Sequence, residues 1–192
     1  MSDMLQNEKK RLRTLCRTLL SAPGEGEAVC RQVLALPEFR QAKTIMAFCS
    51  TEDEPDTRLL LEQALAAGKR LCLPRCTGGG RMQAYAVTTL AQLQPDRWGI
   101  PAPAADCPVV PPEEIDLIIA PCVACTREGV RLGRGAGYYD RFAARTAAPL
   151  AVLCLSTRLF DMLPAEPHDR RAALVITAQA VYRPPAAADV SL

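Results

Sequence analysis

Short apolar runs recur along the chain, and each is bounded by polar residues or proline. Runs of this length favour strands that are buried on both faces, as in a parallel sheet. The expected strands are TIMAFCS from Thr44, RLCLP from Arg70, IDLIIAP from Ile115, APLAVLCLS from Ala148 and RAALVIT from Arg171. MQAYAV, residues 82–87, alternates weakly between apolar and polar positions and indicates a further strand at an edge of the sheet.

Segments with a helical apolar period lie between these strands. DTRLLLEQALAAGKR, residues 56–70, joins the first two strands, and GYYDRFAART, residues 137–146, joins the third and fourth. Residues 27–36 form another expected helix before the first strand. Strand–helix–strand units place parallel strands side by side, so the pattern predicts an α/β fold: a three-layer, open, mostly parallel sheet flanked by helices. We expect a single domain over residues 1–192. An antiparallel strand at an edge would be compatible with this mostly parallel sheet.

The segments outside this pattern are expected to be a helix, a surface crossing and a tail. Residues 4–20 combine leucines near helical spacing with interleaved lysines and arginines, which predicts a basic amphipathic helix. Its cations fit either a solvated face or a binding face. Residues 93–112 are rich in proline and exclude a long helix, so they are expected to cross the surface. The tail, residues 183–192, has no periodicity and is expected to fray.

The composition is that of an ordinary globular protein. The 192 residues carry 23 Lys and Arg against 21 Asp and Glu, a net charge of +2, and 49% of them are hydrophobic. This content argues against a disordered chain, and the small, dispersed positive charge argues against duplex nucleic acid as a ligand. No apolar run approaches the roughly 20 residues that span a bilayer, and the first residues lack a secretory hydrophobic core. We therefore expect a cytoplasmic protein with no nucleic-acid or membrane partner. We also expect a monomer.

The cysteines have two possible meanings. There are nine, an odd number in a chain long enough for a real core, which favours reduced thiols over a disulfide framework. Cys122 and Cys125 form a CxxC pair, which is typical of a redox centre or of half a metal site. Cys72 and Cys76 could complete a four-sulfur zinc site, although the set matches no full template. Structural thiols are the favoured interpretation.

RLGRGAGYYD, residues 131–140, is the segment most informative about chemistry, because it follows a strand and opens a helix. Its glycines leave backbone amides free to point at an anion, and its arginines add positive charge, so it is a candidate phosphate cradle. The spacing matches neither the P-loop nor the full dinucleotide fingerprint, and a tight turn without a ligand uses the same residues. Asp140 and Asp169 are candidate Mg²⁺ ligands, with capping as the alternative role. Glu54 lies just beyond the first strand, where open α/β sheets bind ligands; an exposed loop acid is the alternative.

Collinear motifs over residues 9–177 resemble the 5-formyltetrahydrofolate cyclo-ligase family, also called 5,10-methenyltetrahydrofolate synthetase. The most specific motif is RLGRGAGYYDRF. It is supported by K-x-x-L-R at residues 9–13, E-x-D-T at 54–57, LP at 73–74, WGIP at 98–101, IDLIIAP at 115–121 and LPxExHD at 163–169. The resemblance implies an enzyme, an ATP-dependent C–N bond-forming ligase.

The reaction that the resemblance implies is the cyclisation of 5-formyltetrahydrofolate to 5,10-methenyltetrahydrofolate, with release of ADP and phosphate. The formyl oxygen would attack the γ-phosphoryl group of ATP and give an imidate phosphate, and N10 would then add to the activated carbon while phosphate leaves. Such a reaction demands positioning and charge neutralisation more than acid–base catalysis.

The same resemblance implies roles for particular residues. Arg131 and Arg134 would matter most for catalysis. ATP would contact Lys9, Arg13, Arg131, Leu132, Gly133, Arg134, Gly135, Ala136, Gly137, Tyr138 and Tyr139. The folate would contact Cys49, Glu54, Trp98, Arg134, Gly135, Ala136, Gly137 and Tyr138. Asp140 and Asp169 would hold Mg²⁺, with ATP as a co-substrate.

The chain departs from the family pattern after its third expected strand. PCVACT, residues 121–126, stands where the family has a text close to P-G-x-A-F-D, so Thr126 replaces an acid. This departure keeps open a non-catalytic thiol or metal-binding module built on the same sheet. A third hypothesis is an α/β enzyme that acts on another phosphorylated ligand, such as a sugar phosphate or a coenzyme A ester, because one fold hosts many reactions.

Overall fold

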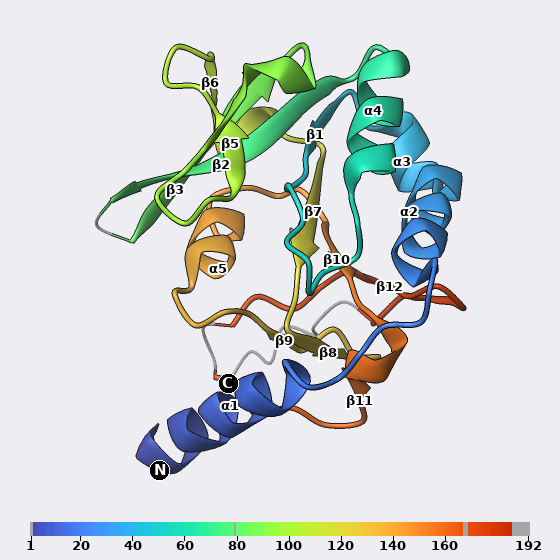
Figure 1. Ribbon diagram of the computed structural model, residues 1–192, viewed down its shortest axis with the longest axis vertical. Helices are drawn as coiled ribbons and strands as arrows, with labels where there is room; N and C mark the ends of the chain where they lie inside the picture. Colours follow the sequence, from blue (N-terminus) through green and yellow to red (C-terminus); the bar gives the residue numbers. More distant parts are fainter. Residues whose placement is uncertain (1, 79, 167–168, 186–192) are drawn as a thin grey trace.

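The computed structural model describes residues 2–78, 80–166 and 169–185, and it has a central sheet with helices on both faces (Figure 1). Among these residues eight strands form the sheet, in the order β13 (Val181–Tyr182), β12 (Leu174–Ile176), β10 (Leu150–Leu153), β7 (Leu117–Pro121), β1 (Thr44–Met46), β2 (Arg70–Gly78), β3 (Arg81–Val87) and β6 (Val109–Val110). The strands from β12 to β2 run parallel, whereas β13 pairs antiparallel with β12, β3 with β2, and β6 with β3. The expected three-layer, mostly parallel α/β sheet is confirmed.

Helices cover the two faces of this sheet. One face carries α2 (Glu25–Ala35), α3 (Pro37–Gln41) and α4 (Arg58–Ala66), and the other carries α5 (Tyr138–Ala143) (Figure 1). β10 shows how its residues divide: Ala151 and Leu153 belong to the cluster with α2, α3 and α4, whereas Leu150 and Val152 belong to the cluster with Phe142 of α5. Because both faces are covered, the strand appears in the sequence as one continuous apolar run.

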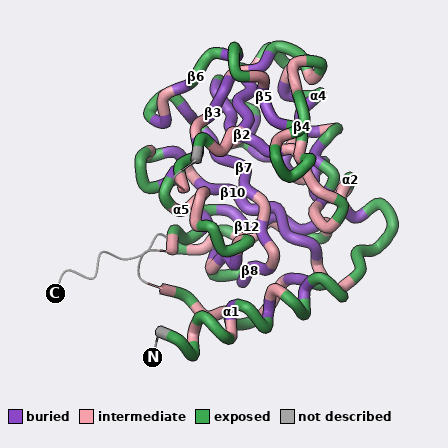
Figure 2. Tube along the Cα trace, turned by 60° about the vertical axis from the view of Figure 1, so that its left-hand side comes forward, coloured by how far each residue is buried: buried purple, intermediate pink, exposed green. Residues whose placement is uncertain are grey.

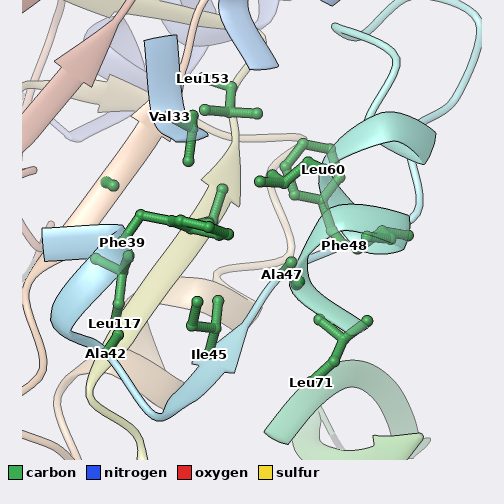
Figure 3. Close-up of a cluster of buried hydrophobic side chains, with 14 of the residues drawn as sticks. Val33, Phe39, Ala42, Ile45, Ala47, Phe48, Leu60, Leu71, Leu117 and Leu153 are labelled. Carbon is green, nitrogen blue, oxygen red and sulfur yellow. The ribbon is translucent and has the colours of Figure 1, made fainter. Parts of the chain in front are cut away.

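The larger hydrophobic cluster lies between α2, α3, α4 and the sheet (Figure 3). Val33, Phe39 and Leu60 of the helices meet Ile45 and Leu117 of the strands, and all five side chains are buried. Full burial of a large apolar side chain stabilises a fold by roughly 1.5–3 kcal/mol. This packing fixes β1 and β7 against the helices and thereby places the segments that follow these strands.

A second sheet carries the N-terminal helix. It consists of β11 (Leu159–Phe160), β8 (Ala124–Thr126) and β9 (Arg131–Leu132). α1 (Ser2–Cys16) packs on it through Leu12 and Cys16, which share a small hydrophobic cluster with Ala124 and Leu132. Figure 2 shows that much of the remaining surface of α1 is exposed. The basic helix therefore lies outside the layers of the central sheet and beside the segment that leads into the glycine-rich loop.

The N-terminal helix is shorter at its C-terminal end than we expected. It ends at Cys16, whereas the prediction was a helix over residues 4–20. The hydroxyl of Thr18 donates to the carbonyl of Leu15 at 2.7 Å, and such a bond competes with continuation of the helix. Leu20 is 84% exposed and lacks the packing that would stabilise a further turn.

Two other segments are more regular than their sequences indicate. MQAYAV belongs to β3, which pairs with both β2 and β6, so the prediction of an edge strand was wrong. The proline-rich segment, residues 93–112, contains β6 and a two-stranded ribbon of β4 (Leu93–Pro95) and β5 (Pro101–Pro103). Short 3₁₀ helices η1 (Leu90–Gln92) and η2 (Pro112–Glu114) lie near its two ends. Proline is compatible with such short strands when it lies at their ends.

The C-terminal tail was expected to fray over residues 183–192. Arg183 forms an ion pair with Glu38 of α3, so the first residue of this segment is held. Residues 186–192 lie outside the described residues. Within the part of the chain that the structure describes, no helix is long and apolar enough to cross a membrane.

Thr57 holds the segment that follows β1. It is 1% exposed, its hydroxyl donates to the carbonyl of Phe48 at 2.7 Å, and the same oxygen accepts from the amide of Ser50 at 3.1 Å. These bonds join the beginning and the end of residues 48–57, the segment that contains Glu54.

We expect Thr57→Val to lower the free energy of unfolding by about 1–3 kcal/mol, because valine keeps the shape but leaves a buried carbonyl and amide without the hydroxyl. Urea denaturation followed by circular dichroism measures the change. Thr14→Val, at an exposed position of α1, is the control and should change stability by less than about 0.5 kcal/mol. Equal effects of the two substitutions would show that the buried hydroxyl does not stabilise this segment.

Candidate functional site

A cavity of about 910 Å³ lies at the carboxyl ends of β1 and β7. Phe48 and Cys49 follow β1, Pro121 and Cys122 lie at the end of β7, and all four line it. The chain leaves β1 through α4 toward β2, and it leaves β7 through α5 toward β10 on the opposite face of the sheet. In open α/β sheets, ligands bind where the crossovers of two neighbouring strands diverge in this way.

All the residues that the family resemblance assigned to ATP, folate or Mg²⁺ line this cavity. They are Lys9, Arg13, Cys49, Glu54, Trp98, Arg131, Leu132, Gly133, Arg134, Gly135, Ala136, Gly137, Tyr138, Tyr139, Asp140 and Asp169. They come from segments that are far apart in the sequence. The motifs give only their order along the chain, and the fold brings them together in space. Their individual roles stay predictions.

The glycine-rich loop, residues 133–137, forms part of the cavity wall. Gly135 and Gly137 have φ values of 105° and 65°, in the left-handed region that favours glycine. A Cβ atom on Gly135 would lie 3.3 Å from Cζ of Arg13, and one on Gly137 would lie 2.8 Å from Nη1 of Arg141. The two glycines therefore allow guanidinium groups to approach the loop backbone closely.

α1 supplies two cations to the cavity wall. Arg13 contacts the glycine-rich loop, and Lys9 contacts residues near the C-terminal end of the sequence. Nε of Arg13 donates to the carbonyl of Gly133 at 2.8 Å. Nζ of Lys9 lies 2.8 Å from the carboxylates of both Glu166 and Asp169, and the side chain of Lys9 is 7% exposed. Burial alone would lower the pKa of Lys9, but its hydrogen bonds to these two carboxylates outweigh burial and raise the pKa. Lys9 therefore carries a stable positive charge in the cavity wall.

Arg131 is a second buried cation in the wall, with a side chain that is 4% exposed. Its Nη2 lies 2.8 Å from Oδ2 of Asp140, and its Nη1 donates to the carbonyl of Pro121 at 3.3 Å. Its Nε has no hydrogen-bond partner among the described residues. A guanidinium has five donor hydrogens, so Arg131 has capacity for a further acceptor in addition to Asp140.

Arg134 connects the glycine-rich loop to the turn after β1. Its Nη2 lies 2.8 Å from Oδ1 of Asp53 and 3.1 Å from Oε1 of Glu54, and it also donates to the hydroxyl of Thr51. Oε2 of Glu54 accepts from the amide of Thr51 at 2.9 Å, and the side chain of Glu54 is 6% exposed. The pairing of Arg134 thus joins the segment expected to bind phosphate to the acid expected to contact the folate.

Part of the cavity wall is apolar and aromatic, formed by Phe48, Met82, Trp98, Tyr138 and Tyr139. Trp98 is 52% exposed, and Cζ of Arg97 lies 3.9 Å from the centre of its ring. The carboxylate of Asp96 accepts from the amide of Trp98 at 2.8 Å and fixes this turn. Exposed aromatic surface beside polar groups is typical of a site for a flat, polar ring system.

Sequence reasoning missed Gln6, Asp96, Arg141 and Glu166, which also line the cavity. Nη2 of Arg141 donates to the carbonyls of Gly80 and Ala136, both at 2.6 Å, and so connects the β2–β3 hairpin to the glycine-rich loop. Nε2 of Gln6 donates to Glu166 at 3.0 Å. Glu166 lies within the LPxExHD motif and Arg141 within RLGRGAGYYDRF. Their positions in these motifs could therefore have identified them as candidate site residues. Nothing in the sequence distinguishes Gln6 or Asp96.

Both cysteines of the CxxC pair are buried. A hydrogen bond with the Cys154 thiol, together with burial, raises the pKa of Cys122, and burial raises that of Cys125. A protonated thiol is a poor nucleophile and a poor metal ligand. No three His, Cys, Asp or Glu side chains in the described ranges are grouped so that they could hold a metal ion, so Cys72 and Cys76 do not complete a four-sulfur site.

Asp140 and Asp169 have the chemistry that Mg²⁺ requires. Both carboxylates line the cavity, one paired with Arg131 and the other with Lys9. Mg²⁺ prefers oxygen ligands and commonly uses one or two carboxylates together with substrate phosphates. The donor set therefore fits Mg²⁺ that arrives with a nucleotide, provided that the two carboxylates share their charge between the metal and these cations.

Comparison with known proteins identifies relatives that cover most of the chain. The model of the 5-formyltetrahydrofolate cyclo-ligase family matches residues 5–178. The chain is similar to 5-formyltetrahydrofolate cyclo-ligase of Mycolicibacterium smegmatis, with 34% identity over 191 residues, 91% of this chain and 95% of that protein. It is also 34% identical over 122 residues to a probable 5-formyltetrahydrofolate cyclo-ligase of Schizosaccharomyces pombe, an alignment that spans 62% of this chain and 60% of the relative.

Solved structures show the same fold. The NMR structure of Aquifex aeolicus 5,10-methenyltetrahydrofolate synthetase aligns with a TM-score of 0.82 and 28% identity, over 98% of this chain and 97% of that chain. The 5,10-methenyltetrahydrofolate synthetase from Mycoplasma pneumoniae aligns with a TM-score of 0.69 and 19% identity, over 90% of this chain and 98% of that chain. The second similarity concerns the fold alone.

Proposed function

The chain belongs to the 5-formyltetrahydrofolate cyclo-ligase family of enzymes, and we propose that it converts 5-formyltetrahydrofolate to 5,10-methenyltetrahydrofolate with ATP and Mg²⁺, releasing ADP and phosphate. One observation carries the proposal: Lys9, Arg13, Arg131 and Arg134, from opposite parts of the chain, line a single cavity that also has aromatic walls. A triphosphate requires such a concentration of positive charge, and a pterin requires flat apolar surface.

The proposed reaction has two bond-forming steps. The formyl oxygen attacks the γ-phosphorus of ATP while the bond from this phosphorus to the ADP oxygen breaks, which yields an imidate phosphate and ADP. N10 then adds to the activated carbon and loses its proton, and phosphate leaves with the former formyl oxygen. Both steps depend on in-line placement and on neutralisation of phosphoryl charge.

The cations of the cavity supply this neutralisation. Lys9 and Arg13 bind the phosphates from α1, and the backbone of residues 132–139 borders them from the loop. Arg131 and Arg134 stabilise the transferring phosphoryl group, because preformed donors in a partly buried site need little reorganisation. Asp140 and Asp169 would hold Mg²⁺, which when bound neutralises further phosphate charge.

The folate occupies the other part of the cavity in this proposal. Glu54, with a carboxylate that Thr51 and Arg134 hold in place, accepts hydrogen bonds from pterin N–H groups. Trp98 stacks on the ring system or flanks it, and Cys49 contributes to the wall. Gly135 and its neighbours allow the loop backbone to approach both substrates.

We expect the purified chain to produce methenyltetrahydrofolate from 5-formyltetrahydrofolate, with absorbance that rises only when ATP and Mg²⁺ are both present. Omission of ATP, chelation of Mg²⁺, and replacement of ATP by an analogue whose γ-phosphoryl group cannot be transferred should each abolish the signal. Tightly bound zinc without ATP-dependent turnover would contradict the proposal and support a thiol module instead. Turnover of another phosphorylated compound, without activity on the folate, would also contradict it.

Three further parts of the proposal concern the protein's surroundings. We propose that it acts on small molecules alone, as a monomer, in the cytoplasm. Light scattering after size-exclusion chromatography checks the monomer.

A further inference from the structure

Arg158 is a buried cation that the proposed reaction does not use. It ends η3 (Ser156–Arg158), the 3₁₀ helix that follows β10, and its side chain is 5% exposed. It is not among the described residues that line the cavity. It nevertheless contacts the turn that carries Glu54.

The contacts of Arg158 are few for a buried charge. Nη1 donates to the main-chain carbonyl of Asp53 at 2.6 Å and lies 3.9 Å from Oδ2 of the same residue. Nη2 donates to the carbonyl of Leu19 at 3.5 Å, and Nε has no partner among the described residues. A buried cation with incomplete hydrogen bonding costs free energy, and an apolar side chain of similar volume would cost less. Stability of the fold therefore does not explain a guanidinium at this position.

Asp53 connects Arg158 to the cavity. Its backbone carbonyl accepts from Arg158, while its side-chain Oδ1 accepts from the hydroxyl of Thr51 at 2.6 Å and from Nη2 of Arg134 at 2.8 Å. Glu54, the next residue, contacts the same Arg134. Arg158 thus fixes the backbone of a turn whose two acids together hold Arg134.

We infer that Arg158 is a positioning residue for the reduced folate: by holding the carbonyl of Asp53, it keeps Glu54 and Arg134 in the arrangement that receives the pterin. The inference rests on the proposed function, which assigns Glu54 to this substrate. Lys9 and Arg13 are held by α1 and by contacts with other segments, so ATP binding depends much less on this turn.

Arg158→Gln should raise the KM for 5-formyltetrahydrofolate about tenfold and change the KM for ATP less than about twofold, because loss of a charge-assisted hydrogen bond loosens the turn that carries Glu54, whereas Lys9 and Arg13 still bind the phosphates of ATP. Arg158→Lys keeps the positive charge and one donor nitrogen, so its folate KM should rise less than about threefold. Quenching of the fluorescence of Trp98, the only tryptophan, measures the Kd for 5-formyltetrahydrofolate without ATP. The Kd values of the variants should rank in the same order as their KM values for this substrate. Thermal unfolding shows whether each variant is folded at the assay temperature. If Arg158→Gln does not fold, the folate-selective change in Arg158→Lys carries the test.

Arg127→Gln is the matched control, because Arg127 also pairs with an aspartate but is 50% exposed and distant from the turn after β1 in sequence. It should leave both KM values unchanged. In a Glu54→Gln background, Arg158→Gln should add less than about twofold to the folate KM, since it acts through Glu54.

Equal changes in the two KM values, or full additivity with Glu54→Gln, would overturn the inference and show that Arg158 only supports the fold. The failure of the proposed function looks different. A wild-type chain without ATP-dependent turnover contradicts that function whatever the variants do, whereas an unchanged folate Kd in Arg158→Gln overturns the role of Arg158 alone.

Discussion

Replacing Lys9 and Arg13 together by alanine is expected to raise the KM for ATP by about 100-fold, with a change of less than about threefold in the KM for 5-formyltetrahydrofolate. The double variant removes two cations from the wall assigned to the triphosphate. In the wild-type chain, Nζ of Lys9 lies 2.8 Å from the carboxylates of Glu166 and Asp169. The variant lacks this positive charge, so the two carboxylates repel the phosphates of ATP more strongly. Loss of the Arg13 bond to the carbonyl of Gly133, 2.8 Å long, further loosens the loop. Initial rates at varied concentrations of each substrate give both KM values.

The double variant Lys10→Ala and Arg17→Ala is the control, because it removes the same charge from exposed positions of the N-terminal segment. It should leave both KM values within about twofold, since exposed charges are screened by salt. Breaking a buried ion pair costs about 3–5 kcal/mol, so both variants are assayed well below their unfolding temperatures. An equal rise in the two KM values of the Lys9 and Arg13 variant would show that α1 has a structural role only.

Asp140→Asn is expected to lower kcat by about 100-fold and to raise the Mg²⁺ concentration needed for half-maximal rate, because a neutral amide is a weaker ligand for a hard cation. The substitution also removes the charged partner of Arg131, whose Nη2 lies 2.8 Å from Asp140. Asparagine keeps one oxygen in place and preserves the shape of the side chain. Rates over a range of Mg²⁺ concentrations at saturating ATP separate the two effects.

Asp161→Asn is the matched control for this variant. Asp161 also pairs with an arginine, Arg127, at 2.9 Å, but its side chain is 91% exposed. It should change neither kcat nor the Mg²⁺ requirement. A reduced kcat in Asp140→Asn with an unchanged Mg²⁺ requirement would mean that Asp140 acts by holding Arg131 and is not a metal ligand.

The α/β fold was predictable because each layer leaves its own periodicity in the chain. The five expected parallel strands appear as apolar runs, since both of their faces are covered, and all five form neighbouring strands of the central sheet. Strand ends were less predictable, because pairing with partners distant in sequence determines them. β2 extends to Gly78 because β3 pairs along its length, and MQAYAV became an interior strand because β6 covers its other side.

The motifs named many of the residues that line the cavity, but the contacts among these residues were not predictable. Motif resemblance selected sixteen residues, and all of them line one cavity. The pairing of Arg134 with Asp53 and Glu54, and the support that Arg158 gives to this turn, have no sequence signal. An arginine in a short 3₁₀ helix is indistinguishable in sequence from an exposed one, because burial depends on the packing of distant segments.

By itself the amino-acid sequence determined the class of fold, the order of strands and helices, and the family, because these depend on local periodicity and on motifs that are contiguous in the chain. Only the tertiary structure decided that Lys9 meets Asp169, that Arg13 reaches Gly133, and that a buried Arg158 supports the turn of Glu54. These contacts join residues more than 100 positions apart. Their geometry follows from how α1, the two sheets and the connecting turns pack together, which no local pattern records.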